Sequence, residues 1–148
     1  MSQRGRQEVG LVKSPKIYLQ DSGVLHFLHD VTSFQELKNN VLIGASWEGH
    51  VIEQIRRKAG DTFQYFYYRT QQGTECDLVL VRSNKVVAAI EIKYSSAPTF
   101  SKSLKLAMED LQAGTGFIIS PIEKSYPVSK NVHAISLTGF LSTQFDTL

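Results

Sequence analysis

One stretch of the chain, residues 73–95, restricts its possible folds more than any other. Two apolar runs, Leu78–Val81 and Val86–Ile92, flank a turn-prone Ser-Asn pair at residues 83–84. This pattern predicts a β-hairpin. The second run is almost continuously apolar, which is typical of a strand covered on both faces. We therefore expect the hairpin at the centre of an α/β domain whose mixed sheet carries helices on its faces.

Charged residues interrupt this hairpin. Asp77 opens the first strand, on the face expected to continue through Val79 and Val81. Glu91 and Lys93 lie near the end of the second strand and share one face, because side chains alternate along a strand. A charge inside so apolar a strand costs several kcal/mol unless it is paired or reaches solvent through a cleft.

Two interpretations of these charges remain open from the hairpin alone. If the Asp77 and Glu91 carboxylates converge to ~4 Å, they repel by about 4 kcal/mol at an effective dielectric constant near ~20. A divalent cation would relieve this repulsion, and hard oxygen ligands suit Mg²⁺ or Mn²⁺. Lys93 would then face a scissile phosphate or orient the attacking water. In the other interpretation, Lys93 pairs with one of the two acids and only closes the edge of a sheet.

A third acidic residue comes from a predicted helix that runs from Ser46 to about Lys58 and is ended by Gly60. At ~100° per residue, the apolar side chains of this helix form one stripe, and Glu48 falls inside it. A carboxylate on the buried face of a helix is uncommon, which suggests a site. Glu48 is also expected in the first turn, where the helix dipole stabilises an anion, and this gives a purely structural alternative.

The spacing of Asp77 and Glu91-x-Lys93 across a hairpin resembles the motif of the PD-(D/E)xK nuclease superfamily. More narrowly, residues 13–95 resemble a C-terminal domain of unknown function that follows a P-loop ATPase module in many bacterial and archaeal proteins. Cys76 stands where the superfamily name has proline, a position that varies widely, and residues after 95 match only loosely. The matching segments are Lys13–Leu19 with Asp21-Ser22-Gly23, Gly44-x-x-Trp47-Glu48 with Val51-Ile52-Glu53, Tyr68-Arg69-Thr70, Gly73-x-Glu75-x-Asp77-Leu78 and Ile90-Glu91-Ile92-Lys93.

The resemblance implies a restriction-endonuclease-like core, with a mixed central sheet flanked by helices. It also implies that a glutamate of the first core helix, at the position of Glu48, joins Asp77, Glu91 and the Ile92 carbonyl oxygen in binding Mg²⁺ or Mn²⁺. In that arrangement Lys93 stabilises the negative charge that develops during phosphodiester hydrolysis. The expected partners are nucleic acid and an ATPase module, in cis or in trans.

Three further sets of residues have a functional and a structural interpretation. Arg69 either steadies a phosphate or pairs with Glu75, and we favour the pair. The aromatic strand 63–70 either stacks on unpaired bases or packs a core, and we favour the core. His26 and His29 lie one helical turn apart, but no third metal ligand is evident, so we expect surface histidines.

Patterns elsewhere predict the remaining elements. Ser33 and Glu36 have the spacing of a capping box that starts a short helix. Asp21 or Ser22 is expected to cap a helix over residues 24–28. Further expected elements are a strand at 16–19, a helix over 104–111 ended by Gly114, strands at 116–120 and 132–137, and a last helix capped by Thr138.

Composition limits the class of protein. The 148 residues predict one domain at 13–148, with residues 1–12 as a flexible N-terminal segment or the remnant of a linker. A single cysteine suits the cytoplasm, and no apolar run approaches the ~20 residues of a membrane span. No P-loop motif is present, so we expect no ATP site here and regard the chain as a fragment or a short paralogue of the ATPase proteins.

Three functions follow from these observations. The first is a metal-dependent nuclease. The second is a nuclease-like domain that does no chemistry and binds nucleic acid or a partner for its ATPase, which the small net charge of +2 favours. The third is a structural domain in which the charged hairpin is a salt-bridge patch. We expect a nuclease-fold domain with a divalent-metal site, and leave its catalytic competence, its preference for DNA or RNA, and its oligomeric state open.

Overall fold

The computed structural model describes residues 21–148, so the predictions for residues 1–12 and for a strand at 16–19 lie outside the described part. One mixed six-stranded sheet organises the fold, in the order β1-β2-β3-β4-β6-β5. The strands are β1 (Gln64–Arg69), β2 (Glu75–Arg82), β3 (Lys85–Ile92), β4 (Gly116–Ile119), β5 (Tyr126–Ser129) and β6 (Val132–Ile135). The helical elements are α1 (Ser22–Leu28), α2 (Phe34–Lys38), α3 (Ile43–Ala59), α4 (Lys102–Leu111), α5 (Leu137–Gly139), η1 (Phe140–Gln144) and η2 (Phe145–Thr147).

The predicted hairpin lies in the middle of the sheet. Strands β2 and β3 pair antiparallel, and β3 then pairs parallel with β4. Ser83 and Asn84 form the two-residue turn with φ angles of 51° and 60°. Positive φ at both turn residues matches the right-handed twist of the strands, and asparagine tolerates this region better than most residues. The mixed α/β architecture is confirmed.

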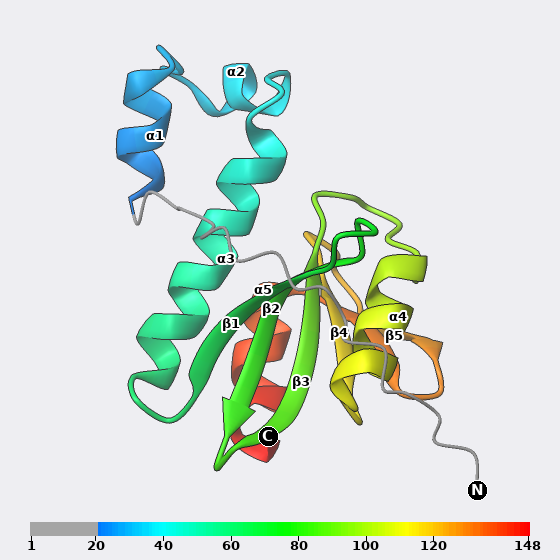
Figure 1. Cartoon of the computed structure of the whole chain (residues 1–148). Coiled ribbons are helices and arrows are strands. Elements are labelled where there is room, and N and C mark those ends of the chain that lie inside the picture. Colours follow the sequence, from blue (N-terminus) through cyan, green and yellow to red (C-terminus); the bar gives the residue numbers. More distant parts are fainter. Residues whose placement is uncertain (1–20) are drawn as a thin grey trace, which may run out of the picture.

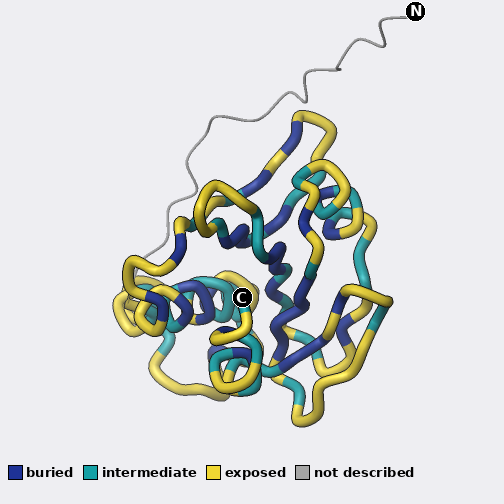
Figure 2. Tube along the Cα trace, turned by 90° about the horizontal axis from the view of Figure 1, so that it is seen from below, coloured by how far each residue is buried: buried dark blue, intermediate teal, exposed yellow. Residues whose placement is uncertain are grey.

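Helices cover both faces of the sheet. Phe117 and Ile119 of β4 pack in one apolar cluster, with α3 residues and with Phe140 from the C-terminal helical segment. Ile118, between them in sequence, packs in a second cluster with Leu104 of α4. Because adjacent strand residues point to opposite faces, α3 and the C-terminal segment cover one face and α4 covers the other (Figure 1). Figure 2 shows the resulting buried centre with exposed turns around it.

A β-bulge interrupts β2 between Cys76 and Val79, next to the candidate site residue Asp77. Phe66 pairs with Val79, but Tyr68 pairs with Cys76, so two steps along β1 correspond to three along β2. The extra residue breaks the alternation of side chains. Cys76 therefore shares a cluster with Val79, although simple alternation along β2 would place the two on opposite faces.

Helix ends show the largest differences from the sequence predictions. Helix α3 begins at Ile43, three residues before the predicted start at Ser46. Its N-cap residue, Leu42, has no side chain that could form a capping hydrogen bond. Helix α4 ends where Gln112 takes a left-handed conformation, before Gly114. Ser136, rather than Thr138, caps the last helical segment. These positions carry no residue pattern that favours the observed boundary over a neighbouring one.

Two N-terminal caps were predicted correctly. Asp21 caps α1 through a 2.7 Å hydrogen bond that its carboxylate accepts from Gly23 N–H. Ser33 and Glu36 form the capping box of α2, with the Glu36 carboxylate accepting from Ser33 N–H. This exposed carboxylate has a lowered pKa, mainly because the Thr32 backbone N–H also donates to it. No helix within residues 21–148 is both long enough and apolar enough to span a lipid bilayer.

Candidate functional site

The Asp77 carboxylate lies against the end of β3. Its Oδ2 accepts a 2.8 Å hydrogen bond from Ile92 N–H. Ala89 N–H donates to Thr115, just before β4, and Lys93 N–H donates to Ile119 of β4, so the Ile92 N–H faces β2 on the other side. The bulge in β2 thus places a side-chain carboxylate where a regular ladder would offer a backbone carbonyl. Asp77 consequently has a structural role whatever else it does.

Glu91 and Lys93 form an ion pair on the α4 face of the sheet. Their Oε1 and Nζ atoms are 3.4 Å apart, and 15% and 31% of the respective side chains are exposed. Ser101 Oγ donates to Glu91 Oε2 at 2.9 Å, and Lys93 Nζ donates to the Thr99 carbonyl oxygen at 3.1 Å. Both charges are thus compensated, and both keep a solvent-accessible side. The shared face of Glu91 and Lys93 is confirmed.

Two serines that the sequence did not single out hold this end of β3. Ser101 caps α4 by accepting from Leu104 N–H at 2.9 Å while it donates to Glu91, so it joins the helix start to the site. Ser120 is fully buried, and its Oγ lies 2.7 Å from the Lys93 carbonyl oxygen and 2.6 Å from that of Ser95. Serine is common at turns and helix starts, so neither residue stands out without coordinates.

Glu48 lies on α3 near the same end of β3. The ring of its neighbour Trp47 packs edge-on against Tyr94, with 6.1 Å between ring centroids. Because α3 begins at Ile43, Glu48 is in the second helical turn, which corrects the expected first-turn position and weakens the helix-dipole explanation. The side chain is half-buried. Helix α3 covers the face of the sheet opposite to α4. Glu48 and Glu91 therefore belong to opposite sides of the sheet.

The three acids do not form a closed metal cage. Within residues 21–148, no group of three or more His, Cys, Asp or Glu side chains is arranged to hold a metal ion. Asp77 and Glu91 each lie next in sequence to a residue of the pair Leu78↔Ile90, at the same end of the hairpin. The Ile92 carbonyl also faces β2, since the N–H and C=O of one strand residue point to the same neighbour. Mg²⁺ commonly binds through one or two carboxylates together with water and substrate phosphate, so this donor set is compatible with it.

The remaining candidate residues have structural partners. Arg69 Nε lies 3.0 Å from Glu75 Oε1, which confirms the predicted pair. His26 Nε2 lies 2.6 Å from Ser46 Oγ, which ties α1 to α3, whereas His29 is exposed. In the aromatic strand, Tyr68 is buried and Phe66 is 52% exposed, so this strand contributes to the core through only part of its rings.

Comparison with known proteins places this chain in a family. The family model described as "Domain of unknown function (DUF4143)" matches residues 43–140, which is more than half of the chain. The chain belongs to the DUF4143 family. The match includes α3, the hairpin and α4, and therefore Glu48, Asp77, Glu91 and Lys93.

Two relatives from mycobacteria resemble this DUF4143 chain over most of its length. They are uncharacterized protein Mb2031c of Mycobacterium bovis and uncharacterized protein Rv2008c of Mycobacterium tuberculosis, each 39% identical over 131 residues. The aligned region covers 88% of this chain but only 29% of each relative. The chain thus spans less than a third of the length of these relatives. No solved structure was found to match it.

Proposed function

We propose that this DUF4143 domain is a nuclease of the PD-(D/E)xK type whose site lies at the end of the β2–β3 hairpin. One observation supports this most strongly: the Asp77 carboxylate bonds to Ile92 N–H, next to Glu91 in the chain, and Glu91 is paired with Lys93. Asp77 and Glu91, with the Ile92 carbonyl oxygen, supply hard oxygen ligands for Mg²⁺ or Mn²⁺. Glu48 completes the family motif from α3.

The residues of the chain have separate roles in this proposal. A bound divalent cation lowers the pKa of a coordinated water and offsets phosphate charge. Asp77 and Glu91 hold the cation, and Ser101 fixes the orientation of Glu91. Lys93 turns from Thr99 to donate to a non-bridging phosphate oxygen, where its charge stabilises the transition state more than the ground state.

An activity assay with charge-neutralising variants tests the proposal. Single- and double-stranded DNA and RNA are incubated with the protein and millimolar Mg²⁺ or Mn²⁺. Asp77→Asn and Glu91→Gln keep side chains that can accept the hydrogen bonds from Ile92 N–H and Ser101 Oγ, so loss of cleavage reports the loss of charge. Glu53→Gln is the matched control, because Glu53 pairs with Arg57 on α3 at 2.8 Å, outside the site.

The expected result is metal-dependent cleavage by the parent and by Glu53→Gln, and a loss of at least ~100-fold in both site variants, the scale of one removed electrostatic contact. Cleavage by Asp77→Asn at the parental rate would contradict the proposal. Chelation of the metal must also stop the reaction.

A second function is favoured by a different observation. Both Glu91 oxygens already have partners, one in Lys93 and one in Ser101, so the hairpin charges are satisfied without a metal. This supports a nuclease-like domain that does no chemistry and binds nucleic acid or regulates an ATPase module of a longer cytoplasmic protein. Nucleic-acid binding that persists in chelator and in Asp77→Asn, without cleavage by the parent, would establish it over the first.

A further inference from the structure

We propose that a second site, in the pocket between α4 and the β5–β6 turn, binds a nucleotide unit: a planar base carrying a phosphate. The pocket has a volume of about 390 Å³, within the usual range for small-ligand sites. None of Glu48, Asp77, Glu91 and Lys93 lines it. The proposal therefore does not rest on the hairpin site.

Two lysines from separate elements give the pocket its anion-binding character. Lys105 projects from α4, and Lys130 belongs to the turn between Ser129 and Val132. Both are exposed, and in the described part of the chain neither forms an ion pair. Glu109 also lines the pocket and offsets one of the two charges. The remaining positive charge suits a ligand with a compact anionic group, such as a phosphate.

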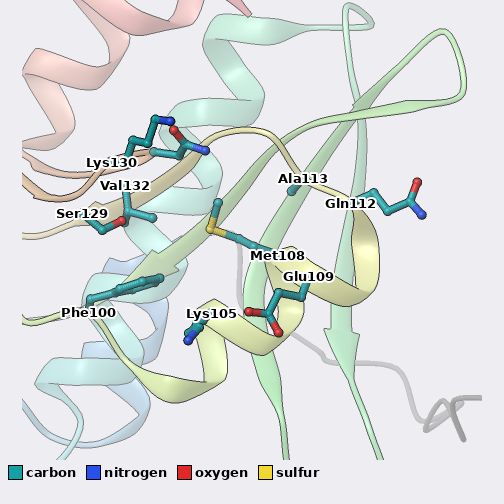
Figure 3. Close-up of a pocket in the computed structure, with 10 residues that line it drawn as sticks. Phe100, Lys105, Met108, Glu109, Gln112, Ala113, Ser129, Lys130 and Val132 are labelled. Atoms are coloured by element: carbon teal, nitrogen blue, oxygen red, sulfur yellow. The ribbon is translucent and has the colours of Figure 1, made fainter.

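The floor of the pocket is apolar. Phe100, Met108, Ala113 and Val132 line it, and Phe100 and Met108 are half-buried. In Figure 3 the Met108 side chain lies between Lys130 on one side and Lys105 on the other. An aromatic ring and a thioether are surfaces on which a base stacks favourably.

Gly116 makes this floor possible. A Cβ atom at Gly116 would lie 2.5 Å from Met108 Sδ and 3.0 Å from a Val132 methyl group. The absence of a side chain there lets Met108 rest directly on the sheet. Asn131 and Ser129 at the rim add polar groups that can bond to a base edge.

The same chemistry is offered by a free nucleotide and by one unit of a nucleic-acid strand. The chain is titrated, in chelator to keep divalent metals out, with AMP, adenosine, inorganic phosphate and a short single-stranded oligodeoxyadenylate. Binding is followed by calorimetry and by amide chemical shifts. We expect AMP to bind more tightly than adenosine or phosphate alone, because both halves of the site contribute.

Lysine variants distinguish this site from nonspecific attraction. Lys105→Gln with Lys130→Gln should weaken AMP binding by about tenfold, since both positive charges that face the phosphate are lost. The charge-matched control, Lys85→Gln with Lys124→Gln, removes two exposed lysines that do not line the pocket and should leave AMP binding unchanged.

The oligonucleotide identifies the source of the ligand. Much tighter binding of the oligodeoxyadenylate than of AMP assigns the pocket to a strand, and equal affinity assigns it to a free nucleotide. The proposal is overturned if neither ligand binds at millimolar concentration, if phosphate binds as tightly as AMP, or if both double variants lose binding equally. Asp77→Asn should bind AMP like the parent, so failure of the nuclease proposal and failure of this one give different results.

Discussion

Replacement of Asp77 separates its structural role from its proposed role as a ligand. Asp77→Ala removes the carboxylate that accepts from Ile92 N–H at 2.8 Å, and Ile92 is only 8% exposed. Hydrogen bonds to charged groups contribute about 1.5–3 kcal/mol, and leaving a buried N–H unpaired costs a similar amount. Asp77 itself is half-buried, so we expect a somewhat smaller loss than this range, about 1–2 kcal/mol. Asp77→Asn keeps an oxygen acceptor and should lose less than about 1 kcal/mol.

The assay for this prediction is reversible unfolding in urea, with a chelator present so that metal binding adds nothing to stability. For a domain of this size, the loss in Asp77→Ala corresponds to a fall in Tm of roughly 2–8 °C. Equal destabilisation by alanine and asparagine would refute the hydrogen-bond argument. If Asp77→Ala were as stable as the parent, the hydrogen bond between Asp77 and Ile92 N–H would not contribute to the stability of the fold.

Two further predictions concern the surroundings of the site. Ser101→Ala should lower the free energy of unfolding by about 1–2 kcal/mol, because it removes the N-cap of α4 and the donor to Glu91; Ser103→Ala in the same helix is the control, and equal losses in urea unfolding would contradict the assignment. Burial raises the pKa of the Cys76 thiol to about 12, so the native thiol should react with a disulfide reagent at pH ~8 far more slowly than the urea-unfolded chain does. Because the unfolded thiol ionises near its ordinary value of 9.0, Cys76 stabilises the fold below that pH and this contribution is lost as the pH rises toward 12. Burial and the hydrogen bond to Asp110 also raise the pKa of Tyr68, so its contribution to stability is likewise lost at high pH. A thiol that reacts equally fast in both states would contradict the burial argument.

The hairpin could be predicted from the sequence because several local signals agree there. Apolar strands, a turn-forming Ser83-Asn84 pair and charges at the strand ends all indicate the same structure, and the observed strands β2 and β3 follow it. The capping box at Ser33 and Glu36 is equally local, since both partners lie within four residues. Such features need no knowledge of the tertiary fold.

The features missed depend on contacts between distant segments. The bulge between Cys76 and Val79 arises where β2 pairs with β1, and no residue type there marks it. Strand β5 contains Pro127 and has no fully buried residue, so it lacks both the apolar pattern and the propensity of a strand. It pairs with the free edge of β6. The link from Ser101 to Glu91 spans ten residues and becomes visible only when the start of α4 is placed.

The position of Glu48 shows how a small boundary difference changes an argument. A helix starting at Ser46 would place this acid beside unpaired backbone N–H groups, whereas the observed start at Ile43 places it beyond them. The apolar stripe itself was predicted correctly, since Val51, Ile52 and Ile55 are all buried. The sequence thus identified the face that carries Glu48 and missed its distance from the helix end.

Titration of the full chain with Mn²⁺, followed by the electron paramagnetic resonance signal of the free ion, tests the central claim most directly. The parent and Glu53→Gln should each bind Mn²⁺, and Asp77→Asn and Glu91→Gln should each lose that binding while remaining folded by circular dichroism. A parent that binds no Mn²⁺ at millimolar concentration, or an Asp77→Asn variant that binds it as well as the parent does, would contradict a cation site at the end of the β2–β3 hairpin.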